Sequence, residues 1–314
     1  MKSIFRLLPA FLFVSLPLLA QTSTSTPLTL DTPTGKIAGT LIVPSATKPP
    51  VVLIIAGSGP TDRNGNNPMM TNNSLKMLAE ELAKQGIASV RYDKRGIAES
   101  QPAGGKEEDL RFDTFINDAV GWINLLKADK RFSGVIVLGH SEGSLIGMVA
   151  ANQAKADGFI SVAGAGLPAD KLIREQMKNQ PPQVAEMVNP ALDSLVQGKW
   201  VKNVNPMLGA LLRPSVQPYL ISWFKYDPQV EIRKLNMPVL LVQGTSDIQV
   251  SEEQARLLAS AKPDAQLVII DRMNHVLKES EKEMQANIAT YSNPTLPVMP
   301  ALATAVAGFI QKKK

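Results

Sequence analysis

The stretch Val135-Ile-Val-Leu-Gly139-His-Ser141-Glu-Gly143-Ser-Leu-Ile-Gly-Met148 decides the fold class. Its apolar, β-branched beginning predicts a buried strand, and the residues after Gly143 predict a helix. Between the two, the pattern Gly-x-Ser-x-Gly is typical of a sharp strand-to-helix turn, where the flanking glycines leave room for the chain to fold back. Ser141 would then project above a sheet, so this stretch predicts an α/β fold with an accessible serine.

Apolar runs alternate with amphipathic stretches along the chain, which predicts a mostly parallel sheet with helices on both faces. Segments 28–30 and 37–43 are expected to form an antiparallel hairpin at the side of this sheet. Further strands are expected at 51–56, 87–92, 135–139, 159–163, 239–243 and 267–270.

Two helix starts are predicted from capping residues. Asn72 or Asn73 is expected to cap a helix that begins directly afterwards. Ser251 followed three residues later by Gln254 predicts a capping box at a second helix.

The alternation of strands and helices stops at residues 167–226, which are rich in Leu, Met and Pro. We interpret this segment as a helical cap inserted between two core strands. Its aromatic side chains either line an apolar pocket or pack the cap onto the core, and the sequence leaves both open: Trp200, Tyr219, Trp223 and Phe224.

The N-terminus has the pattern of a signal peptide. Lys2 and Arg6 precede an apolar run at 7–20, and residues 21–27 are expected to form a polar linker. We expect cleavage after Ala20 and export of the chain to the periplasm or the medium, with residues 28–314 as the folded domain. A retained membrane anchor is the alternative, although the apolar run is shorter than the roughly 20 residues of a membrane-spanning helix.

Composition excludes several classes of function. The chain has no cysteine, which rules out disulfides, thiol nucleophiles and thiolate metal sites. Without Lys2 and Arg6 the formal net charge of +5 falls to +3, and no basic patch suggests nucleic-acid binding. The two histidines are too far apart for a metal motif, and no nucleotide-binding glycine pattern is present, so we expect no cofactor and no metal.

A serine needs a neighbouring base to become a nucleophile, and histidine is the suitable side chain near neutral pH. The chain has only His140 and His275. His140 is adjacent to Ser141 and is expected to point away from it, which leaves His275 as the base. Asp247 follows a core strand and lies between serine and histidine in chain order, so it is the expected acid, with Asp271 as the alternative.

Two backbone amides are expected to stabilise a developing oxyanion. One belongs to Glu142, the residue after the serine at the start of the helix. The other is expected in the Gly-rich loop after the strand at 51–56, where Ser58 is the candidate.

These motifs together resemble α/β-hydrolases of the serine aminopeptidase S33-like group, which includes bacterial carboxylesterases. The resemblance extends from about residue 28 to the C-terminus. It rests on Gly57-Ser-Gly-Pro-Thr-Asp-Arg-Asn-Gly-Asn, Arg91-Tyr-Asp-Lys-Arg-Gly, Gly139-His-Ser-Glu-Gly-Ser, Asp227-Pro with the following Met237-Pro-Val-Leu, Gly244-Thr-Ser-Asp and Met273-Asn-His.

The resemblance implies the α/β-hydrolase fold, with a mobile cap at about 167–226. It also implies a catalytic triad of Ser141, Asp247 and His275, with the Ser58 and Glu142 amides as the oxyanion hole. Asp93 and Arg95 match a loop that buttresses the site, and we assign them a structural role.

The sequence therefore predicts a serine hydrolase that cleaves carboxylic esters through an acyl-enzyme and acts on a small-molecule ester or acyl substrate. An exopeptidase or amidase with the same triad is an alternative, but the cap shows no clear acidic cluster to hold a free amino terminus, and Glu175 and Glu186 are unremarkable candidates for it. Acyl transfer to an alcohol and a non-catalytic binding module for a small apolar ligand also remain open. No membrane span is expected after signal removal, and the oligomeric state is left open.

Overall fold

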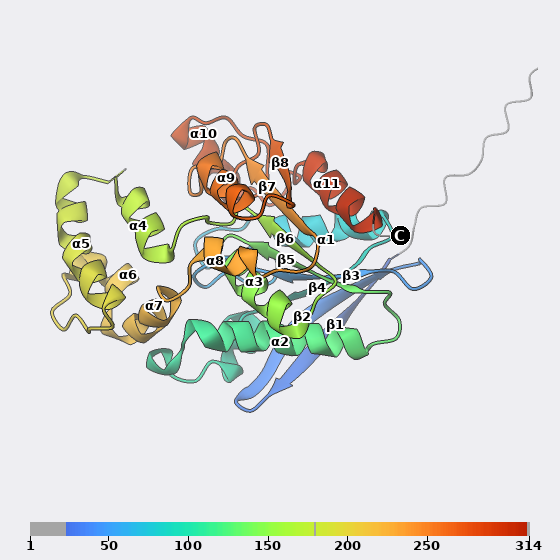
Figure 1. Cartoon of the computed structure of the whole chain (residues 1–314), viewed down its shortest axis with the longest axis horizontal. Coiled ribbons are helices and arrows are strands. Elements are labelled where there is room, and N and C mark those ends of the chain that lie inside the picture. Colours follow the sequence, from blue (N-terminus) through green and yellow to red (C-terminus); the bar gives the residue numbers. More distant parts are fainter. Residues whose placement is uncertain (1–22, 179, 313–314) are drawn as a thin grey trace, which may run out of the picture.

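A single sheet organises the computed structural model, which describes residues 23–178 and 180–312. Eight strands of these residues follow the order β1-β2-β4-β3-β5-β6-β7-β8 (Figure 1). β1–β2 and β2–β4 pair antiparallel, and the remaining neighbours pair parallel. The predicted α/β fold with a mostly parallel sheet is confirmed. The expected signal peptide at 1–20 lies outside the described residues.

The strands occur at the apolar runs that predicted them, except that β1 begins at Ser23, within the segment expected to be a polar linker. The hairpin of β1 and β2 is at the side of the sheet, and the strands from β3 to β7 are buried along their whole length because helices cover both faces. The bounds are β1 Ser23–Thr32, β2 Gly35–Pro44, β3 Val51–Ile55, β4 Ala88–Tyr92, β5 Val135–His140, β6 Gly158–Val162, β7 Val239–Gly244 and β8 Gln266–Ile270.

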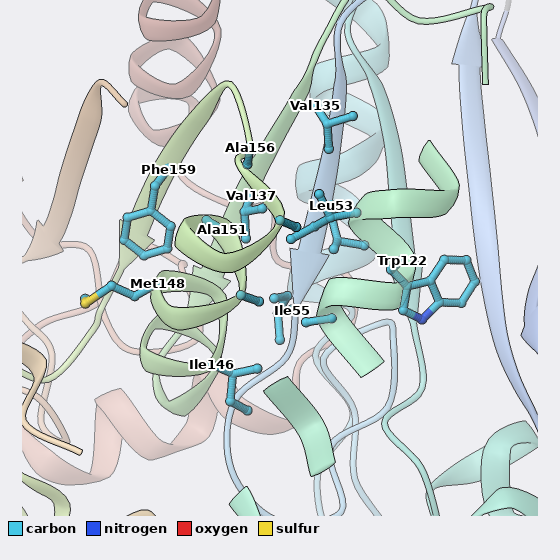
Figure 2. Close-up of a cluster of buried hydrophobic side chains, with 14 of the residues drawn as sticks. Leu53, Ile55, Trp122, Val135, Val137, Ile146, Met148, Ala151, Ala156 and Phe159 are labelled. Atoms are coloured by element: carbon cyan, nitrogen blue, oxygen red, sulfur yellow. The ribbon is translucent and has the colours of Figure 1, made fainter. Parts of the chain in front are cut away.

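Helices form a layer on each face of the sheet. α1 and α11 pack into one apolar cluster, and α2, α3, α8 and α9 contribute to the other. Figure 2 shows the second cluster, in which Leu53 and Ile55 of β3 lie near Trp122 of α2. The bounds are α1 Ser74–Lys84, α2 Phe112–Ala128, α3 Glu142–Ala154, α8 Pro228–Arg233, α9 Glu252–Ala261, α10 Met284–Ala289 and α11 Pro300–Gln311.

The two helix starts were predicted at the right places, but the capping bonds differ. Asn73 occupies the N-cap position of α1 without a side-chain cap, and the Asn72 side chain instead accepts from the first amide of the helix at 2.9 Å. The capping box at α9 is wrong, because Ser251 makes no cap bond. The Gln254 side chain instead accepts a hydrogen bond from the Gly166 amide at 3.0 Å. Because Gly166 is far away in the sequence, this side chain is engaged outside the helix and does not form the capping box.

Residues between β6 and β7 form a helical layer beside the sheet, visible on the left of Figure 1. The described part of this segment contains no strand. α4–α7, here called the cap helices, enclose an apolar cluster of their own that includes Val188, Leu192 and Leu220. Their bounds are α4 Ala169–Met177, α5 Pro182–Val196, α6 Gly209–Leu212 and α7 Gln217–Trp223.

Short 3₁₀ turns complete the connections. They are η1 Ala98–Ala103, η2 Glu107–Asp109, η3 Pro206–Leu208, η4 Pro214–Val216 and η5 Thr290–Ser292. Throughout 23–178 and 180–312, no helix has both the length and the apolar character that crossing a membrane requires.

Candidate active site

Ser141 lies at the turn between β5 and α3 in a strained conformation. Its φ of 55° and ψ of −123° are rarely adopted by a residue with a side chain. Two glycines make the turn possible through close approach of the backbone. A Cβ on Gly139 would lie 2.1 Å from the Gly143 carbonyl oxygen, and one on Gly143 would lie 2.4 Å from the Ile55 carbonyl oxygen. The Gly-x-Ser-x-Gly pattern is therefore a steric requirement of this fold.

Asp247 and His275 follow β7 and β8 and form a buried pair. His275 Nδ1 is 2.8 Å from Asp247 Oδ2. Because the carboxylate accepts, we assign the proton to Nδ1, which leaves Nε2 as the basic nitrogen. Gln243 Nε2 donates to the same carboxylate oxygen at 3.0 Å, and the Gln249 and Val250 amides donate to Oδ1 at 2.8 and 2.9 Å.

These interactions determine the ionisation of Asp247. Burial alone would raise the pKa of its carboxyl, but His275 and the hydrogen bonds from the Val250 and Gln249 amides outweigh burial and lower the pKa. The carboxylate is therefore ionised at neutral pH and can orient the imidazole and stabilise its protonated form.

His140 has a polar role that its position beside the serine did not reveal. Its ring was expected to point away from Ser141 into packing or a loop. It lies 4.9 Å from the His275 ring between centroids, and Nε2 is 2.8 Å from the carbonyl oxygen of His275, which is in a loop. Burial, with a further contribution from His275, lowers the pKa of His140 to about 3. A neutral His140 therefore donates to the His275 backbone and steadies the loop that carries His275.

The alternative acid, Asp271, is directed elsewhere. It is exposed and accepts a hydrogen bond from Thr245 Oγ1 at 2.9 Å. The geometry therefore pairs His275 with Asp247, as the chain order favours.

The Gly-rich loop after β3 passes against the serine. A Cβ on Gly57 would lie 3.1 Å from Ser141 Cβ and 3.4 Å from His140 Nδ1, so only glycine fits without displacing its neighbours. Ser58, Ser141 and Glu142 line the same cavity. The two expected oxyanion residues are thus brought to the expected nucleophile.

This cavity has a volume of about 760 Å³ and separates the ends of the strands from the cap helices. Its cap wall includes Leu172, Leu220, Tyr219 and Trp223. Of the aromatic residues singled out in the sequence, Tyr219 and Trp223 line the cavity, whereas Trp200 is 55% exposed. Part of the cap's aromatic content therefore forms a wall for an apolar group.

The charged side chains in the cavity wall are paired. Lys94 Nζ is 3.0 Å from Glu142 Oε2, Arg95 Nε is 2.9 Å from Asp118 Oδ2, and Arg213 Nε is 2.9 Å from Glu107 Oε2. Among the described residues that line the cavity, every charged side chain therefore has a partner of opposite charge, which disfavours a charged substrate. In the described part of the chain, no three His, Asp or Glu side chains gather as a metal site would require.

Known proteins similar to this chain include a family of serine hydrolases. The family profile described as serine aminopeptidase, S33, matches residues 70–231, which is half of the chain. The chain belongs to this S33 family. The resemblance noted from the motifs is thereby confirmed.

Among individual relatives, esterase EstD of Thermotoga maritima is 29% identical to this S33-family chain over 256 residues. The match covers 80% of this chain but only 60% of the length of the Thermotoga maritima esterase. A solved structure of Est1E from Butyrivibrio proteoclasticus with ferulic acid bound has a TM-score of 0.60 and 17% identity over 91% of this chain and 98% of its own. The Pyrococcus furiosus esterase Pf2001 has a TM-score of 0.59 and 15% identity, over 97% and 96% of the two chains. At these identities the structural likeness supports the fold.

Sequence reasoning missed several polar contacts in this S33-family site. The Glu142 side chain accepts hydrogen bonds from Lys94 and from the Tyr219 hydroxyl, and Gln243 holds Asp247. Lys94 and Glu142 were visible within the quoted motifs, but nothing in the sequence indicated that they meet. Tyr219 had no signal beyond its place in an aromatic stretch of the cap.

Proposed function

We propose that this protein is an exported serine hydrolase that cleaves carboxylic esters through an acyl-enzyme. Ser141 is the nucleophile, His275 the general base and Asp247 the acid that orients it. The observation that carries the proposal is the arrangement of a serine on a strained strand-to-helix turn and a buried His275–Asp247 pair at the same edge of the sheet, where they follow the carboxyl ends of β5, β8 and β7. The S33 membership and the esterase relative support the same reaction class.

In the proposed reaction each of these groups has one role. Ser141 Oγ attacks the ester carbonyl carbon while His275 Nε2 removes the hydroxyl proton. The carbonyl oxygen becomes an oxyanion that accepts hydrogen bonds from the Ser58 and Glu142 amides. The bond to the alcohol then breaks, and the alcohol leaves with the proton from His275. A water molecule then gives a proton to His275 and attacks the acyl carbon. The bond from this carbon to Ser141 Oγ breaks, His275 returns the proton to Oγ, and the acid is released.

The cavity favours a neutral substrate over a peptide. An exopeptidase must hold the ammonium of a free amino terminus, for which an unpaired carboxylate is the suitable partner. Glu107 and Glu142, the acidic residues in the cavity wall, are engaged by Arg213 and Lys94. An apolar acyl group against Leu172 and Trp223 fits the remaining wall. The S33 family description keeps an aminopeptidase as the second candidate.

The first experiment compares the chain from residue 21 with its Ser141→Ala variant on p-nitrophenyl esters of increasing acyl length. Aminoacyl nitroanilides are assayed in parallel. We expect ester turnover in the parent and a fall of about 10⁶-fold in kcat in the variant, because the nucleophile is lost.

The matched control is Ser144→Ala, three residues further along α3, where the hydroxyl contacts Ser161 Oγ at 2.7 Å. It should retain ester turnover. Cleavage of nitroanilides alone would reassign the protein as a peptidase. Equal turnover by parent and Ser141→Ala, or none by either, would contradict the proposal and favour a binding module.

Export is a separate part of the proposal and rests on the N-terminal pattern alone. Expression of the full chain in a bacterium should yield a periplasmic or secreted product whose intact mass corresponds to cleavage after Ala20. A membrane-bound product that keeps residues 1–20 would instead identify this segment as an anchor.

A further inference from the structure

A buried ion pair lies beside the proposed oxyanion hole and takes no part in the proton transfers described above. Lys94 follows β4, and Glu142 is the first residue of α3. Their charged atoms are 3.0 Å apart, and each side chain is only 3% exposed. Charges removed from water to this extent need close partners, so the position of the Lys94 ammonium is tightly constrained.

The Lys94 ammonium also donates a hydrogen bond of 2.6 Å to the Gly57 carbonyl oxygen. This carbonyl belongs to the same planar peptide unit as the Ser58 amide. In a trans peptide, the C=O and N–H bonds point in opposite directions. A lysine that fixes the Gly57 carbonyl on one side therefore fixes the direction of the Ser58 N–H on the other.

We propose that Lys94 is a positioning residue that aims the Ser58 amide at the oxyanion and, through Glu142, couples this amide to the second oxyanion donor. The inference rests on the proposed function and deepens it. The ion pair joins the two donor-bearing segments directly, because Glu142 supplies one donor amide through its backbone and holds Lys94 through its side chain. The relative position of the two amides is thus fixed before substrate binds, as oxyanion stabilisation requires.

The chain of contacts continues into the cap. Glu142 Oε2 accepts from Lys94, and Oε1 accepts from the Tyr219 hydroxyl of α7. Burial, reinforced by the Glu142 carboxylate, raises the pKa of Tyr219 well above its usual value, so the hydroxyl remains protonated and donates. Both oxygens of Glu142 therefore have a donor, and the cap contributes to holding the carboxylate in place.

The test is Lys94→Met, which keeps the length of the side chain and removes its donors. Fluorophosphonate titration of Ser141 gives the concentration of active sites. We expect kcat per active site on a p-nitrophenyl ester to fall on the order of 100-fold with KM changed by less than about threefold, because the lost interaction forms in the transition state. Affinity for an alkyl trifluoromethyl ketone, which forms a tetrahedral adduct on serine, should fall by a similar factor.

Lys127→Met is the matched control. Lys127 also donates to backbone carbonyls, those of Ala154 and Lys155 at 2.9 and 3.0 Å, but at the far end of α3. It should leave kcat, KM and ketone affinity within about twofold of the parent. A Lys94→Met enzyme with parental kcat and ketone affinity would overturn the inference. So would a loss confined to thermal stability, or a rise in KM alone.

Two further variants guard against misfolding, since Lys94→Met leaves Glu142 buried without its cation. The double variant Lys94→Met/Glu142→Gln removes both charges and should show the same kcat deficit. Tyr219→Phe keeps the ion pair and should lower kcat by at most about tenfold, without a matching rise in KM. Parental kcat in the double variant would also overturn the inference. Failure of the proposed function has a different signature, because Ser141→Ala would then retain ester turnover. In that case the inference about Lys94 fails together with the proposed function.

Discussion

The sheet wall and the cap wall of the cavity, each together with the buried residues that support it, are built by different physical means. On the sheet side, side chains are held by directional hydrogen bonds. Both oxygens of Asp247 accept such bonds, and His275 is held through its ring nitrogen and its carbonyl. On the cap side, Leu192, Leu195 and Leu220 belong to an apolar cluster that is separate from the two clusters of the sheet.

This difference assigns different tasks to the two walls. Hydrogen bonds fix atoms to within fractions of an ångström, which acid–base chemistry requires. Apolar packing sets volume and shape but tolerates exchange between side chains of similar size. Substitutions on the sheet side should therefore change the rate of the chemical step, and substitutions in the cap should change local stability and the choice of substrate.

The largest effect is expected for Asp247→Asn. The amide can no longer hold His275 in the tautomer that keeps Nε2 basic, so kcat for ester hydrolysis should fall about 10⁴-fold while the fold is retained. The measurement is steady-state turnover with circular dichroism of both proteins. Asp271→Asn is the control, because Asp271 is exposed and bonded to Thr245, and it should leave kcat unchanged. A large loss in Asp271→Asn with little loss in Asp247→Asn would reverse the assignment.

An intermediate effect is expected in the cap. Leu192 is fully buried in the cap cluster, and its replacement by alanine should cost about 2–5 kcal/mol of local stability. Hydrogen exchange should then accelerate in α4–α7 while the strands of the sheet keep their protection.

The matched variant is Leu240→Ala, in the equally buried β7. It should accelerate exchange throughout the chain, since β7 pairs with β6 and β8. If the two variants gave the same exchange pattern, the cap and the sheet would unfold as one cooperative unit, and the contrast between the walls would not extend to stability.

Features that depend on short stretches of sequence could be predicted. The strands were recognisable as apolar runs, and the turn at Ser141 follows from a five-residue pattern whose glycines the structure requires. The pairing of His275 with Asp247 followed from the scarcity of histidine and from chain order. In each case, local conformation or elimination carried the information.

Features that depend on long-range contacts could not be predicted. Glu142 meets Lys94 across 48 residues and Tyr219 across 77. The expected capping box at α9 failed for the same reason, because Gln254 contacts Gly166, 88 residues away. Side-chain hydrogen bonds across such separations depend on how elements pack, which residue spacing alone does not encode.

His140 belongs to the sheet wall, and its effect on stability should depend on pH. Its pKa is lowered from 6.5 to about 3 in the folded protein. Below pH 6.5 the unfolded chain therefore binds a proton at this position that the folded chain does not bind. The contribution of this residue to stability is fully present above pH 6.5 and is lost as the pH falls from 6.5 toward about 3. Within this window the loss is about 1.4 kcal/mol for each pH unit.

The smallest effect, and the finest test of the sheet wall, is expected for His140→Gln. Glutamine can donate to the His275 carbonyl but does not titrate. Between pH 7.5 and 5.5 the parent should lose on the order of 1 kcal/mol more unfolding free energy than the variant. Urea midpoints at the two pH values measure this difference, and His275 and the carboxylates cancel because both proteins contain them. If the parent and the variant lost the same unfolding free energy, His140 would bind protons equally in the folded and unfolded states. Burial beside His275 would then not lower its pKa.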